Sequence, residues 1–123
     1  QAGLSIPPFG TTHADYFKGE IPCTRSLTAK EVEQEYELNT GKVIVETFGE
    51  LDASATPAVL VKGHAPFTWG EDVMEAVKHA VVLESIAKMA FRNIVLGNQQ
   101  PIEKYLLEKH FRRKHGDDAC YGQ

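Results

Sequence analysis

Residues Pro57 to Gly70 read PAVLVKGHAPFTWG, and this stretch decides what kind of fold the chain can form. Its first part, residues 58–62, is rich in apolar β-forming residues and is predicted to be a strand. The strand is expected to end at Gly63-His64. A second strand is predicted over residues 42–48, where three β-branched residues follow one another, and the two strands are expected to form an antiparallel pair.

Helices are predicted on both sides of these strands. Thr28 and Glu31 have the spacing of a capping box, which predicts that a helix begins there, and Gly41 is expected to end it. Apolar residues recur at three- and four-residue steps from Asp72 onward, which predicts a long amphipathic helix that Gly97 ends. The expected helices are one turn near residues 12–17, followed by residues 28–39, 72–96 and 102–114. On the long helix the positions expected to face inward are Val73, Val77, Ala80, Leu83, Ala87, Ala90 and Ile94. No linker divides the chain, so one domain of helices and strands, residues 1–123, is expected.

Composition and charge argue against several classes of protein. The chain has 123 residues and a formal net charge of −4, whereas proteins that bind nucleic acid gather Lys and Arg on one face. No apolar run approaches the roughly 20 residues of a membrane span. Two cysteines, Cys23 and Cys120, match no metal spacing, and we expect them to be reduced in the cytoplasm. Gln1 is not a start methionine, so we expect the chain to begin inside a longer translated product.

His64 is the strongest single candidate for a chemical role. A side chain directly after a strand has a rigid base, and catalytic groups often collect at such positions. Neutral imidazole is a good ligand for zinc and similar ions, but a catalytic zinc needs about three protein ligands and an open position. None of the other four histidines forms a local pair with His64. The remaining ligands would therefore come from distant positions, and a hydrogen-bonded loop histidine is the commoner alternative.

Other candidates lie near the two ends of the chain. Asp15, in the turn-rich segment THADY, could act as a general base, although capping a helix is the commoner use of such a residue. The phenol of Tyr121 could exchange a proton only if the C-terminal tail docks on another surface, such as a neighbouring subunit. By default His79 and His110 are core or surface histidines, and Glu37 is a solvated charge.

Several segments, in order along the chain, resemble the L-ribulose-5-phosphate 4-epimerases of the class II aldolase and adducin family. They are GTTHADYF at residues 10–17, IPCTR at 21–25, residues 41–48, residues 57–70 with HAPFTWG, and residues 113–123 with the ending YGQ. The resemblance covers essentially the whole chain, and the combination is more specific than any one segment.

The resemblance implies a three-layer α/β/α fold with a mainly antiparallel central sheet, and a cyclic homotetramer with active sites between subunits. The implied reaction interconverts L-ribulose 5-phosphate and D-xylulose 5-phosphate by breaking and re-forming the bond between carbons 3 and 4. A divalent cation, usually zinc, would act as a Lewis acid toward the negative charge that develops.

The resemblance also implies roles for individual residues. Asp15 and Tyr121 correspond to the acid/base groups, with Tyr121 reaching over from the adjacent subunit. His110 matches a histidine that lines the same site. Thr11 and Glu37 lie near positions where the family has polar residues of the substrate site.

His64 corresponds to the third metal histidine of the family. Close relatives often have His-x-His at this strand end, whereas this chain has Lys62-Gly63-His64, which brings a positive charge near the metal. The resemblance implies that the other metal ligands and the phosphate-binding loops precede residue 1. The N-terminal half of the domain is therefore expected to be missing.

Three alternatives stay open. A sugar-phosphate aldolase of the same family, such as an L-fuculose-phosphate aldolase, is the nearest, although the YGQ ending and the THADY segment favour the epimerase. A non-catalytic module like the adducin head would keep the fold without the metal site, and the presence of His64, Asp15 and Tyr121 argues against it. A small secreted domain would need Cys23 paired with Cys120.

Overall fold

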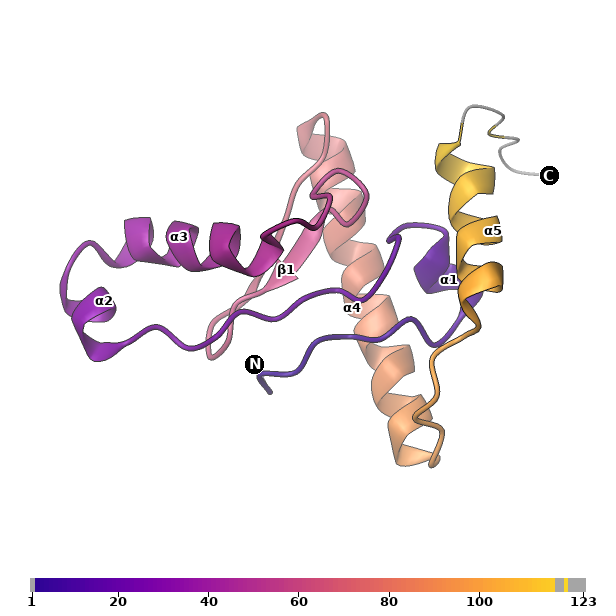
Figure 1. Ribbon diagram of the computed structural model, residues 1–123, viewed down its shortest axis with the longest axis horizontal. Helices are drawn as coiled ribbons and strands as arrows, with labels where there is room; N and C mark the ends of the chain where they lie inside the picture. Colours follow the sequence, from indigo (N-terminus) through magenta and orange to yellow (C-terminus); the bar gives the residue numbers. More distant parts are fainter. Residues whose placement is uncertain (1, 117–118, 120–123) are drawn as a thin grey trace.

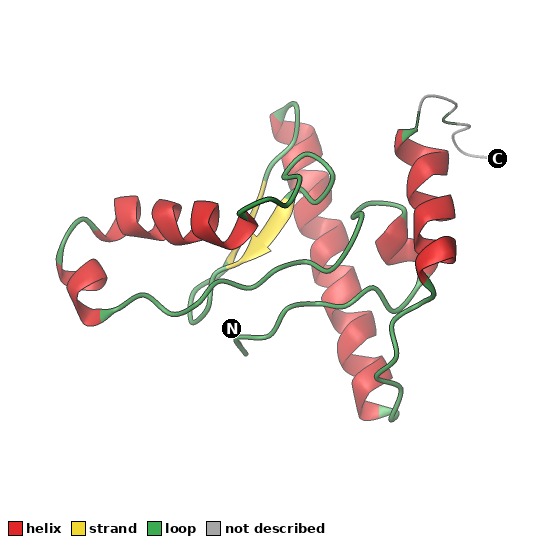
Figure 2. Ribbon diagram, viewed as in Figure 1, coloured by secondary structure: helices red, strands yellow, loops and turns green. Residues whose placement is uncertain are grey.

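The computed structural model describes residues 2–116 and 119. In this part the chain forms five α-helices and one two-stranded antiparallel sheet. Figure 1 shows the long helix α4 in the middle, with α1 and α5 to one side of it and an arm made of α2 and α3 extending to the other. Figure 2 shows how much of the chain between these elements is loop. The elements are α1 Thr11–Ala14, α2 Ala29–Glu33, α3 Tyr36–Phe48, β1 Ala58–Leu60, β2 Pro66–Thr68, α4 Val73–Val95 and α5 Lys104–His115.

The sheet is a short hairpin. The predicted strand at residues 58–62 is confirmed over Ala58–Leu60, but its antiparallel partner is Pro66–Thr68 and not residues 42–48. Val61 to Ala65 form the turn, which Gly63 permits because its φ of 76° lies in the left-handed region. A hairpin this small is marginal alone. It is stabilised by α4, since the Thr68 hydroxyl donates to the Ala76 carbonyl at 3.0 Å.

The prediction of a strand over residues 42–48 is wrong, because this segment belongs to helix α3. The run of β-branched residues 43–45 favoured a strand and hid the helical spacing of the side chains that become buried. The buried or half-buried side chains of α3 recur at three- and four-residue steps, as a helix requires. They are Asn39, Thr40, Val43, Ile44, Thr47 and Phe48. Burial on one face outweighs a strand preference that depends strongly on context.

The capping box at Thr28 is confirmed. The Thr28 hydroxyl accepts from the Glu31 amide, and the Glu31 carboxylate accepts from the Thr28 amide at 2.7 Å. Gly41, however, does not end this helix, because it lies inside α3. The break comes earlier, at Glu35, whose φ of 53° separates α2 from α3.

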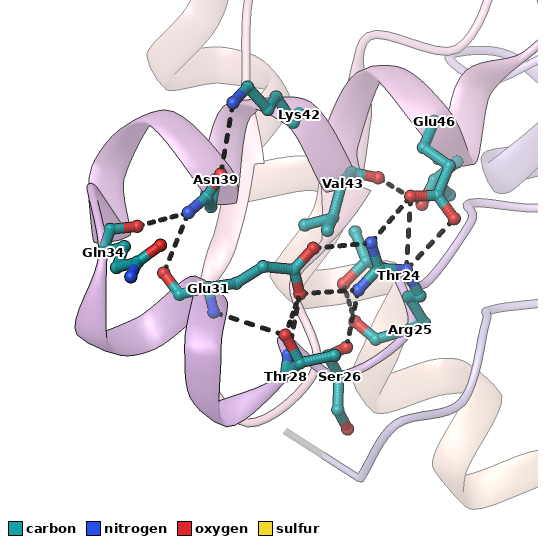
Figure 3. Close-up of polar contacts among 11 residues, drawn as sticks. Thr24, Arg25, Ser26, Thr28, Glu31, Gln34, Asn39, Lys42, Val43 and Glu46 are labelled. Atoms are coloured by element: carbon teal, nitrogen blue, oxygen red, sulfur yellow. Dashed lines mark hydrogen bonds and ion pairs between the residues drawn. The ribbon is translucent and has the colours of Figure 1, made fainter.

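Arg25 ties the two helices of the arm together. Its guanidinium donates to both carboxylate oxygens of Glu31 on α2, each at 2.9 Å, and to Glu46 on α3 at 2.9 Å (Figure 3). The hydrogen bonds from Arg25, followed by those from Thr28, lower the pKa of Glu31 to about 2. The arm therefore keeps its charged contacts throughout the neutral pH range.

The long helix is confirmed, with Asp72 as its N-cap, accepting from the Glu75 amide at 2.8 Å, and Gly97 in the left-handed region just past its end. Its buried face is rotated from the predicted one. The buried residues are His79, Leu83, Ile86 and Ala90, so only Leu83 and Ala90 of the expected set are buried.

A broad apolar surface of α4 is exposed as a result. It includes Val73, Val77, Val81, Phe91 and Val95. Glu84 and Lys88, which form an ion pair at 3.3 Å, separate Val81 from Phe91, so this surface consists of two exposed apolar patches. Exposed apolar patches are typical of protein–protein interfaces. None of the described helices, α4 included, has the length and apolar character to cross a membrane.

The core forms where α1 and the following loop meet α4 and β1. Phe17 is fully buried there, with its ring 5.8 Å from that of His13 and 6.1 Å from that of His79 between centroids. The remaining members are Ile6, Ile21, Ala58, Leu83, Ile86 and Ala90.

His13 is a buried imidazole that no sequence pattern singles out. Its ring is 2% exposed, and its Nε2–H donates to the Gly19 carbonyl at 2.6 Å. Its Nδ1 has no hydrogen-bond partner among the described residues. Burial is the main cause that lowers the pKa of His13 below the ordinary value of 6.5, since the interior disfavours the charged ring.

This pKa predicts how stability depends on pH. Below pH 6.5 the unfolded chain takes up a proton at His13 before the folded chain does, so the free energy of unfolding should fall as the pH decreases from 6.5 toward the lower folded pKa. Urea denaturation at several pH values should show this fall for the unmodified chain and a smaller one for His13→Gln. The exposed His64→Gln variant is the matched control and should keep the original slope. Equal slopes in all three proteins would contradict the prediction.

Candidate functional site

Asp15 and His110 lie in contact although 95 residues separate them in the sequence. Asp15 follows the last residue of α1, and its amide donates to the Thr11 carbonyl at 2.9 Å. The Nδ1–H of His110, on α5, donates to Asp15 Oδ1 at 2.9 Å. The two side chains are 21% and 27% exposed for His110 and Asp15, so solvent reaches the pair only partly. This is the only contact between two of the candidate side chains in the described part of the chain.

A second histidine of α5 reaches the same residue. The Nε2–H of His115 donates to the main-chain carbonyl of Asp15 at 3.0 Å. The His115 ring stacks on Phe111, with centroids 4.4 Å apart and planes inclined by 23°. This contact could not be predicted from the sequence, because a histidine at the basic end of a helix has no local pattern that distinguishes it.

A cavity of about 360 Å³ lies beside this cluster. Its wall includes Tyr16, which follows Asp15, and His115, together with Trp69, Glu75 and His79. The size falls in the range of small-ligand sites. Two aromatic rings, two carboxylates (Glu71 and Glu75) and two imidazoles contribute to its lining, which suits a small polar ligand such as a sugar.

The pair can move protons. A carboxylate that accepts one hydrogen bond on Oδ1 keeps Oδ2 available to take a proton from a hydroxyl. Because the Nδ1 of His110 carries the hydrogen toward Asp15, its Nε2 is the free nitrogen of the neutral ring. The arrangement therefore offers two proton-accepting atoms, on Asp15 and on His110, within one cluster.

The other sequence-selected residues lie apart from this pair or beside it. Thr11 begins α1 and contacts Asp15 through its carbonyl oxygen. His64 lies in the hairpin turn, exposed, with its ring stacked at 5.8 Å on that of Phe67. Glu37 is exposed in the first turn of α3, on the arm. Tyr121 lies outside the described residues.

Within the part of the chain that the structure describes, His64 has no neighbouring ligands that would complete a cation site. Across residues 2–116 and 119, no group of three or more histidine, cysteine, aspartate or glutamate side chains is placed to hold a metal ion. An exposed single imidazole provides too few ligands for zinc, which takes three or four from a protein. The described residues therefore do not fit a resident metal by themselves.

Comparison with known proteins gives the family. A family model described as the Class II Aldolase and Adducin N-terminal domain matches residues 1–91. Relatives named L-ribulose-5-phosphate 4-epimerase UlaF, from Salmonella paratyphi A (strain ATCC 9150 / SARB42) and Salmonella typhi, are each 58% identical over 125 residues, which covers 100% of this chain and 54% of the relative. A relative of the same name from Salmonella paratyphi C (strain RKS4594) is 57% identical over 126 residues, with the same coverage.

The chain thus spans about half the length of the curated relatives it matches. The family assignment does not depend on how much of the relatives' length is covered. The family model matches most of this chain, including α1, the hairpin and most of α4. The chain belongs to the class II aldolase and adducin family.

Proposed function

We propose that this chain supplies the acid–base part of an L-ribulose-5-phosphate 4-epimerase, which interconverts L-ribulose 5-phosphate and D-xylulose 5-phosphate. The observation that carries the proposal is the hydrogen bond of 2.9 Å between His110 and Asp15, next to a cavity of about 360 Å³. The names of the relatives, which match the whole of this chain at 57–58% identity, support it.

The chemistry needs a proton acceptor at the hydroxyl of carbon 4. When Asp15 Oδ2 takes that proton, the electron pair of the O–H bond forms a carbonyl and the bond between carbons 3 and 4 breaks. The products are glycolaldehyde phosphate and the enediolate of dihydroxyacetone. Rotation of the aldehyde, attack of the enediolate carbon on its other face and return of a proton to the new alkoxide give the epimer, so atoms and charge balance.

Inversion requires a second proton-transfer group on the opposite side of the aldehyde. We assign that role to Tyr121, contributed by an adjacent subunit. His110 holds Asp15 in place and orients its free oxygen, while Thr11 and Glu37 are proposed as polar residues of the substrate site.

Members of this family generally depend on a divalent metal. We propose zinc as the ion and His64 as one of its ligands, with the other ligands outside the described residues. When bound, the ion would act as a Lewis acid toward the negative charge that develops. The proton transfers above are assigned to Asp15 and Tyr121, with His110 positioning Asp15.

The proposal extends to architecture and assembly. We propose that residues 1–123 form part of one three-layer α/β/α domain with a mainly antiparallel central sheet. We also propose that the protein is a cyclic homotetramer with active sites between subunits. The exposed apolar surface of α4 supports association. A phosphorylated sugar does not cross a membrane unaided, so its enzyme is proposed to act in the cytoplasm.

The first prediction of the proposed function concerns the chain alone. It should bind zinc weakly and convert no L-ribulose 5-phosphate, because the described residues offer one imidazole where catalytic zinc needs about three protein ligands. A chimera that joins the chain to the part of the Salmonella typhi relative that it does not span should bind zinc and produce D-xylulose 5-phosphate. A coupled assay for D-xylulose 5-phosphate, with the intact relative alongside, measures both.

Other results would contradict either the predicted inactivity of the chain alone or the epimerase assignment. Turnover by the chain alone would show that its site is complete without further ligands. Release of free glycolaldehyde phosphate by the chimera, with no D-xylulose 5-phosphate, would indicate an aldolase. A chimera that folds but holds no metal and turns over no substrate would indicate a non-catalytic module of the adducin-head kind.

The second prediction concerns the acid–base pair. In the active chimera, Asp15→Asn keeps the oxygen that accepts from His110 but cannot take a proton, so kcat should fall by about 10²–10⁴-fold. His110→Gln should lower kcat by roughly tenfold, because it retains a donor with a less rigid side chain. Steady-state kinetics measure both. Glu33→Gln, an exposed carboxylate on α2, is the control, and a loss in that variant similar to that of Asp15→Asn would refute a specific role for Asp15.

A further inference from the structure

Asp15 is held at two different points by one helix. His110 binds its carboxylate, and His115, five residues later on α5, binds its main-chain carbonyl. The carbonyls at the end of a helix lack partners within the helix. His115 provides the partner for Asp15 at the end of α1, and no hydrogen bond inside α1 could do so.

The ring of His115 is itself fixed in orientation. It stacks on Phe111, one turn earlier on α5. Because the Nε2 of His115 faces an oxygen that can only accept, this nitrogen carries the proton. The ring also lines the 360 Å³ cavity, as does Tyr16, the residue after Asp15.

The two contacts have different consequences. A bond to the carboxylate alone leaves the backbone of Asp15 free to shift, and the side chain would move with it. A four-residue helix such as α1 has little rigidity of its own. The bond to the carbonyl fixes the backbone from which the carboxylate projects, and the bond to Oδ1 then fixes the direction of the carboxylate.

We propose that His115 is a positioning residue that keeps the Asp15 carboxylate on His110 and directed at its substrate. This inference rests on the proposed function for its kinetic consequence. The contact geometry itself can be tested without any turnover.

The first test reads the hydrogen bond by NMR on this chain, labelled with ¹⁵N. Long-range ¹H–¹⁵N spectra should show His115 protonated at Nε2 and His110 protonated at Nδ1. In His115→Phe, which keeps a ring to stack on Phe111 but has no donor, the His110 Nδ1 resonance should move toward that of a free histidine. His115→Gln, which keeps a donor of similar reach, should retain it.

The second test is kinetic, in the active chimera. His115→Phe should lower kcat about tenfold and leave KM within about twofold, because small displacements of a catalytic group are costly. His115→Gln should recover kcat to within about threefold. His115→Asn, which is too short to reach the carbonyl, gives a second variant without the contact, and Arg113→Gln, exposed on the same helix, is the control.

The results of these two tests distinguish a failure of the proposed function from a failure of the positioning role of His115. If the chimera is inactive, the proposed function fails, and the NMR result still decides the positioning role. An unchanged His110 resonance in both His115→Phe and His115→Asn would overturn the proposal. A lower thermal midpoint with unchanged kcat in these variants would also overturn it, because His115 would then only stabilise the fold.

Discussion

The short helix α1 positions Asp15, the central residue of the candidate site, but α1 is not stable without contacts from other parts of the chain. Four residues are far too few for a stable helix, so α1 depends on contacts outside it. The buried ring of Phe17 and the bond from His13 to Gly19 hold it from the core side. The contacts of Asp15 with α5 hold it from the other side. The position of the Asp15 carboxylate therefore depends on two surfaces that meet only in the folded chain.

Local sequence patterns predicted the elements that local physics controls. The capping box at Thr28, the end of α4 and the first strand of the hairpin all depend on neighbouring residues, and all are found in the structure. The strand predicted over residues 42–48 is a helix, because burial of one face of α3 decided its conformation. The rotated buried face of α4 has the same origin, since which side of an apolar helix is covered depends on distant segments.

The site was predictable only in part, for a related reason. Asp15 and His110 were selected by resemblance, and nothing in their spacing of 95 residues indicates that they touch. His115 and His13 were not selected, because the role of a histidine depends on which atoms face its two nitrogens. The described residues place a hydrogen-bonded carboxylate and imidazole near a cavity, and His64 lies apart from them, exposed at the hairpin turn.

The candidate site depends on the contact between Asp15 and His110, and a double-mutant cycle measures the interaction energy of these two side chains. The free energy of unfolding would be determined for the unmodified chain, Asp15→Ala, His110→Ala and the double variant. We expect a coupling energy of about 1 kcal/mol or more, which is typical of a partly buried hydrogen bond to a carboxylate. Additive effects, with a coupling energy within about 0.3 kcal/mol of zero, would show that the two side chains do not interact and would contradict the account.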